Sequence, residues 1–381
     1  MASPEILQFE QLLAPISDER PGGVELKDDS SLSALYYQIK DAREAARTAE
    51  RQAMQALFAD EGEDIQVERP DWQSVQRLAE QVIAEHSKDL WVVAWLIEAL
   101  TRLHGFAGLR DGFRLARELS YRYWDSIHPE PDEDGYAHTV AQLAGLNGEE
   151  AEGALIRPIE DIPITAGTTY SGLSSADYKE AIDLEAGDPE RRALRIEQGA
   201  ASEAMFQKAV DETPVEFFEN LLEDIDACLD EFAGLSSVLD EKCGESADGY
   251  PAAPPTSNIK NVLSECRERV TSVARHILND PEEEPAAAGG DIAATDGNGQ
   301  AVSSGKVVTR EDAFRALLQV AEFFRRTEPH SPVSYALEQA VRWGRMPLPD
   351  LLKELVGDET TREDIFKRTG IPISNSNEDN D

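Results

Sequence analysis

The sequence predicts an all-α protein with a helical-bundle N-terminal domain, a helical-hairpin middle domain, a flexible linker and a small helical C-terminal module. Three observations predict this fold class. Apolar residues recur at helical spacing along most of the chain, helix-start signals precede several of these runs, and strand-like alternation of apolar and polar residues is missing. We expect extended structure only in residues 155–165, where β-branched residues and prolines argue against a helix.

The expected N-terminal domain covers residues 1–155. After an extended entry, helical patterns occupy residues 32–58, begin again near residues 72 and 90, and continue at 109–127 and 136–150. Ser87 is placed to cap the helix that begins at Leu90, whose residues 90–97 are apolar on every side. A helix of this kind lies inside other helices. Four tryptophans are expected in the core: Trp72, Trp91, Trp95 and Trp124.

The expected middle domain covers residues 156–280. An Asp-Pro pair at residues 188–189 signals one helix start, and a Thr-Pro-Val-Glu box at 213–216 signals another. Two long helices, residues 214–242 and 256–278, are joined by a segment rich in Gly and Pro. This arrangement indicates an antiparallel helical hairpin.

One face of the first hairpin helix is acidic. It carries Glu223, Asp224, Asp226, Asp230 and Glu231. Runs of like charge on a helix usually face solvent, so we interpret this stripe as a solvated surface rather than a metal site.

Residues 281–306 hold no aromatic side chain and a single isoleucine, and they predict a flexible linker. A compact helical module follows at residues 307–373, and a disordered tail at 374–381. The module carries 10 basic and 11 acidic side chains, a net charge of −1, whereas residues 1–306 carry 26 and 61, a net charge of −35. Copies of the module therefore repel one another least, and self-association is expected there.

The whole chain of 381 residues has a formal charge of −39, which disfavours nucleic acid and anionic membrane surfaces as partners. The longest apolar run, residues 90–97, is too short to span a bilayer, so no direct membrane insertion is expected. The N-terminal sequence lacks the features of an export signal, and the three cysteines form no Cys-x-x-Cys motif. A cytoplasmic location is the resulting expectation.

Motifs for catalysis or cofactor binding are missing from the sequence. It contains no phosphate-binding loop, no Gly-x-Ser-x-Gly elbow and no His-Glu-x-x-His motif. Residues 130–135 resemble the start of a calcium loop, but the twelfth position is Ala141 instead of the required glutamate. We therefore expect no catalytic residues, no cofactor and no metal, and interpret residues 130–135 as a turn that leads into a helix.

Two segments resemble a known family. The first contains RPDW, SKDLWVVAWLIEAL, RLHGFAGLRDG and YWDSIHPEPDEDG, and it is similar to the ImpA-type N-terminal domain of the TssA proteins of type VI secretion systems. The second, TREDAFRALLQVAEFFRRTEPHSPVSYALEQAVRWGRMPLPDLLKEL, resembles the C-terminal segment of shorter TssA proteins. The resemblance implies a non-enzymatic protein that helps to build the baseplate and contractile tail in the cytoplasm.

Contact residues for oligomers or partners are expected in the C-terminal module, and they are Phe323, Arg325, Arg326, Glu328, His330, Tyr335 and Trp343. The two arginines either hold a partner carboxylate or pair with Glu322 and Glu328. His330 lies in a Glu-Pro-His-Ser-Pro turn, where bonding to the backbone is a simpler role than catalysis, since no nucleophile or orienting acid accompanies it.

Three functions are compatible with the sequence. In the first, the module forms a ring or higher oligomer, and the acidic N-terminal domains recruit baseplate, sheath and tube proteins of a type VI secretion system. The alternative is a monomeric or dimeric helical adaptor for an effector or regulatory protein. The third is an enzyme with a helical active site, which a deep polar pocket with strongly shifted carboxylates would indicate.

Overall fold

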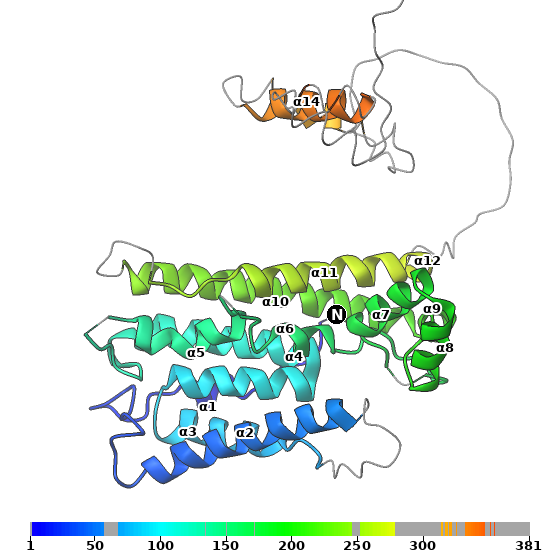
Figure 1. Ribbon diagram of the computed structural model, residues 1–381. Coiled ribbons are helices and arrows are strands. Elements are labelled where there is room, and N and C mark those ends of the chain that lie inside the picture. The colour runs from blue at the N-terminus through cyan, green and yellow to red at the C-terminus, as the bar shows by residue number, and fades with distance from the viewer. Residues whose placement is uncertain are drawn as a thin grey trace, which may run out of the picture. The chain divides into compact units, whose positions relative to one another are not determined.

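The chain divides into two compact units, Met1–Pro285 and Ala286–Asp381. The computed structural model describes residues 2–56, 68–133, 135–149, 151–170, 172–245 and 252–278 of the first unit, and residues 314, 317, 318, 320, 321, 325, 332–346, 351 and 354 of the second. In these ranges the regular structure is helical, with a few isolated β-bridges and no strand (Figure 1). The all-α prediction is confirmed, whereas the predicted domain boundaries stay predictions.

The first unit consists of helices packed around α4 (Leu90–Tyr123). On one side of α4 lie α2 (Ser33–Ala56) and α3 (Trp72–Glu85), and on the other lies the pair α10 (Val215–Cys243) and α11 (Ser257–Val273) (Figure 1). The remaining elements of this unit are α1 (Phe9–Leu12), η1 (Trp124–Ser126), α5 (Ala137–Asn147), α6 (Ile156–Glu160), α7 (Ser175–Ala186), α8 (Pro189–Glu197), α9 (Glu203–Asp211) and α12 (Arg275–Leu278).

The buried position predicted for the apolar helix is confirmed. Val92, Val93, Ala94, Leu96 and Ile97 have no exposed surface. By length and composition, residues 90–126 form the one helical stretch in the described ranges that is apolar enough to cross a membrane, but 78% of its most apolar window is buried inside the protein. It is therefore the core helix of this unit.

α4 consists of two helical segments, residues 90–104 and 106–123, that run back along each other, since the amide of Leu90 donates to the carbonyl of His128 at 2.7 Å. The chain reverses at Gly105. Its φ of 57° and ψ of −140° lie outside the helical region, and glycine adopts a positive φ at little cost. A Cβ at this position would lie 3.1 Å from Cγ2 of Ile162. The two helices predicted from residue 90 and at residues 109–127 thus meet at this one glycine.

Three predictions about local structure were wrong. Residues 156–160 form α6 instead of an extended connector, because Pro158 lies in the first helical turn, where its missing N–H has no helical partner to lose. Asp89 caps α4 instead of Ser87, accepting bonds from the amides of Trp91 and Val92.

The third error concerns the start of α10. Pro214 is its N-cap and makes no side-chain cap. The hydroxyl of Thr213 instead donates to the carbonyl of Ala209 at 2.6 Å and accepts from the amide of Ala166 at 2.8 Å. The Asp188 cap before Pro189 is confirmed, since its carboxylate accepts from the Arg191 amide.

The tryptophans of the first unit belong to the core, as expected. Trp72 and Trp95 are 3% exposed and Trp124 is 8% exposed. Trp91 is half-buried, with its indole donating to the carbonyl of His138 at 3.0 Å.

In the second unit, the structure describes α14 (Val333–Arg345) and scattered positions around it. Ala321 and Val341 are buried. A Cβ at Gly344 would lie 2.6 Å from Cζ of Phe314, so this glycine permits a close approach of the ring to α14.

Candidate functional site

Three of the seven predicted contact residues lie in the described part of the second unit. Tyr335 is 64% exposed on α14. Trp343 is half-buried, and its indole donates to Glu354 at 3.2 Å, which lowers the pKa of that carboxyl. Arg325 pairs with Glu338, which is not one of the pairings expected from the sequence. The other four lie outside the described residues: Phe323, Arg326, Glu328 and His330.

Exposed apolar side chains accompany Tyr335 in the second unit. They are Leu318 (38% exposed), Val320 (44%) and Val333 (38%). Large apolar side chains left in contact with water mark candidate interaction surfaces when several occur together in a small unit.

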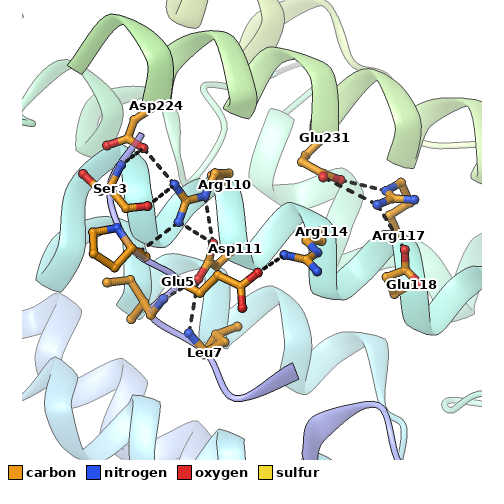
Figure 2. A network of polar contacts seen from close by, with 12 residues as sticks. Ser3, Glu5, Leu7, Arg110, Asp111, Arg114, Arg117, Glu118, Asp224 and Glu231 are labelled. Atoms are coloured by element: carbon orange, nitrogen blue, oxygen red, sulfur yellow. Dashed lines mark hydrogen bonds and ion pairs between the residues drawn. The ribbon is translucent and has the colours of Figure 1, made fainter. Parts of the chain in front are cut away.

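A second candidate lies in the first unit, where charged residues are buried between α4 and α10. Arg110 and Asp111 of α4 and Asp224 of α10 form this cluster, which we call the Arg110 clamp (Figure 2). The guanidinium of Arg110 donates to Asp111 at 2.9 Å and to Asp224 at 2.8 Å. Asp111 is 0% exposed and Asp224 is 4% exposed.

The clamp holds residues 2–13, which we call the N-terminal strap. The amide of Ser3 donates to Asp224 at 3.0 Å, and the amides of Ile6 and Leu7 donate to one oxygen of Asp111 at 2.6 and 3.2 Å (Figure 2). These amides satisfy two buried carboxylates that share a single arginine. Without them, the two buried carboxylates would keep their bonds to Arg110 but lose these amide donors, which is costly.

Asp224 corrects the prediction of a solvated acidic stripe on α10. The stripe is divided: Glu223 and Asp230 are exposed, whereas Asp224 is buried and Glu231 bonds to Arg117 at 2.7 Å. No group of three or more potential metal ligands occurs among the described residues. On α10, Asp224 lies three residues after Leu221 and four before Cys228, so the helical pattern itself places it on the same buried face as these residues.

A buried lysine holds the other end of the strap. Lys88 is 0% exposed, and its ammonium donates to the carbonyls of Leu12 at 2.8 Å and Ile83 at 2.7 Å. Burial lowers the pKa of Lys88 to about 8. Burial also raises the pKa of the neighbouring Asp89 to about 6. Both residues were missed in the sequence, where the Ser-Lys-Asp run resembles an ordinary polar loop.

A groove with a volume of about 880 Å³ lies beside α6, α7 and α8 in the first unit. Its charged side chains pair with one another, as Lys179 does with Glu160 at 2.9 Å and Arg195 with Glu180. The residues that line it contain no cysteine or histidine. The bond to Glu160 raises the pKa of Lys179, which keeps this amine protonated and a poor nucleophile.

Known proteins resemble this chain in sequence and in fold. Residues 13–148 match the family "ImpA, N-terminal, type VI secretion system". The chain is 25% identical to the type VI secretion system component TssA1 of Pseudomonas aeruginosa over 361 residues, 93% of this chain and 96% of that protein.

A solved structure has the same fold. It is the N-terminal domain, with the conserved ImpA_N region, of the TssA component from Burkholderia cenocepacia, with a TM-score of 0.57 and 24% identity over 71% of this chain and 94% of that one. The chain therefore carries a region similar to the ImpA-type N-terminal domain of type VI secretion systems. Over most of its length it is also similar to a TssA protein.

Proposed function

We propose that this chain is a non-enzymatic scaffold of a type VI secretion system, which oligomerises through its C-terminal unit and recruits baseplate, sheath and tube proteins through its first unit. The observation that carries the proposal is the match to TssA1 over 93% of this chain, which extends past the ImpA-type domain into both units. The work would be done in the cytoplasm, where the baseplate and tail assemble.

Charge and exposure support self-association through the second unit. Residues 307–373 have a net charge of −1, so copies of them approach with little repulsion. Tyr335 and Val333 of α14 present apolar surface to solvent. Aromatic side chains that become buried at an interface are frequent contributors to affinity.

The first unit suits recruitment. Its surface is strongly acidic, so it repels other copies at low salt and stays accessible to partners when several copies are held together. Several first units on one oligomer would bind a repeating structure by multiple weak contacts, and their combined affinity exceeds that of any single contact.

Native mass spectrometry of the whole chain tests this proposal. We expect a defined oligomer, and Tyr335→Ala should reduce its size. The matched control is Tyr121→Ala, because Tyr121 is 69% exposed but belongs to α4 of the first unit. A whole chain that is monomeric or dimeric at micromolar concentration would instead support the adaptor for an effector or regulatory protein.

A further inference from the structure

Most of the hydrogen bonds that hold the N-terminal strap are made to its main chain. The clamp accepts from the amides of Ser3, Ile6 and Leu7, and Arg110 donates to the carbonyls of Ser3 at 2.8 Å and Pro4 at 3.1 Å. Contacts of this type do not depend on which side chains the bound segment carries. They require a backbone that is extended over residues 3–7 and presents its donors and acceptors in this order.

The same mode of contact continues along the strap. Lys88 donates to the carbonyl of Leu12 at 2.8 Å, and the hydroxyl of Tyr123 donates to that of Leu13 at 2.7 Å. Side chains add apolar anchors, since Leu7 is 4% exposed and Phe9 is 7% exposed. The strap is thus bound as a peptide ligand would be, with main-chain bonds for affinity and apolar side chains in fixed places.

The strap is joined to the rest of the unit by a segment well suited to act as a hinge. Residues 14–21 are exposed except for the half-buried Ile16, and they contain two prolines. The main-chain bond within them joins the amide of Ile16 to the carbonyl of Pro21 at 3.0 Å. Segments with few buried contacts open at low free-energy cost.

We propose that the Arg110 clamp, together with Lys88 and Tyr123, forms a peptide-binding site, that the strap is its resident ligand, and that the strap of a second copy of this chain exchanges with it. The charge balance favours exchange over simple opening. An empty site would leave Asp111 and Asp224 with one arginine and none of the three strap amides. The resident strap therefore leaves when another main chain takes its place, and the identical segment of a second copy fits by construction.

A synthetic peptide of residues 2–13 with a fluorophore at its C-terminus tests the site on the unmodified whole chain. We expect it to bind. N-methylation of Ile6 or Leu7 in the peptide should weaken binding by about tenfold or more, because each change removes a hydrogen bond to a carboxylate. N-methylation of Gln8 is the matched control, since the amide of Gln8 makes none of the strap's bonds to the clamp.

Exchange between copies has a separate readout. Glu5 is an exposed strap residue that bonds to Arg114 of α4 at 2.5 Å, so Glu5→p-benzoylphenylalanine places a photo-crosslinker beside α4. Isotopically heavy and light copies of this variant would be mixed, irradiated and digested. We expect heavy-light crosslinked peptides between the strap and α4, increasing with incubation time. Crosslinks only within one isotope, or a peptide that binds equally well when N-methylated at Ile6, would overturn the proposal. Neither readout depends on the scaffold function.

Discussion

At the scale of single residues, buried charge in this protein is stabilised largely by main-chain groups. Lys88 bonds to two carbonyls, Asp89 to two amides, and Asp111 to two amides of the strap. Each charge therefore depends on a chain segment that lies close by in space. Loss of either side leaves the other buried without a partner.

Arg110→Ala should lower the free energy of unfolding by about 3–5 kcal/mol, because it leaves two carboxylates buried without their cation. Urea denaturation followed by circular dichroism measures this. Arg114→Ala is the control, since its bond to Glu5 is exposed and contributes about 1 kcal/mol or less. Equal losses for the two variants would show that burial of the clamp does not matter.

Asp89 and Asp71 should give stability profiles of opposite slope. Burial raises the pKa of Asp89 to about 6. The contribution of Asp89 to stability is therefore greatest at pH values below the pKa of this residue in the unfolded chain, and it is lost as pH rises through 6. Glu25 and His128 face it, and His128 opposes the shift. The bond to Ser74 lowers the pKa of Asp71, so its contribution is lost as pH falls.

Asp89→Asn keeps a capping side chain. It should remove the part of the change in unfolding free energy between pH 4 and 7 that comes from Asp89, about 3 kcal/mol at most. Asp71→Asn should remove a small difference of the opposite sign. Chemical denaturation across this pH range measures both. A profile unchanged by Asp89→Asn would mean that His128 and Glu25 dominate the titration.

At the scale of elements, the sequence predicted where helices occur better than it predicted the residues at which they begin and end. The apolar periodicity located α2, α3, α5, α10 and α11 to within a few residues. Two capping assignments failed because Ser87 and Thr213 are both drawn into tertiary structure: Ser87 is fully buried, and Thr213 bonds to α9 and to residue 166. Local sequence reports which residues are able to cap, but tertiary packing selects the one that does.

Gly105→Ala should lower the free energy of unfolding by about 1–2 kcal/mol, because a side chain at φ 57° is strained and Ile162 lies within 3.1 Å of the new Cβ. Gly145 of α5 is the matched control, since nothing lies within 4 Å of a Cβ there. Gly145→Ala should raise stability by about 0.5–1 kcal/mol. Thermal or urea unfolding distinguishes the two, and a neutral Gly105→Ala would mean that a side chain does not strain the backbone at residue 105.

At the scale of the molecule, the fold class was readable from the sequence, whereas the joining of distant segments was not. The clamp unites residues 3–7, 110–111 and 224, and no periodic pattern predicts pairs that are over 100 residues apart. The sequence did reveal the uneven charge of the chain. It could not show that α10 packs directly on α4, so that the ImpA-type segment and the following helices form one compact unit.

A single cooperative unfolding transition of residues 1–285 is expected from this shared core. Four of the five tryptophans lie before residue 125, while the three cysteines, all buried, lie at 228, 243 and 266. Tryptophan fluorescence and thiol labelling in urea therefore monitor different parts of the unit. Coincident midpoints would confirm one unit, and separated midpoints would divide it into two.

The position of α4 in the chain has a consequence for synthesis on the ribosome. This apolar helix is complete at Tyr123, but α10, which covers one side of it, begins at Val215. At translation rates of about 5–20 residues per second, roughly 90 residues take about 5–20 s to appear. During that interval the nascent chain exposes the apolar surface of α4 that α10 later buries. We therefore expect a chaperone at the ribosomal exit tunnel to bind the N-terminal part of this protein.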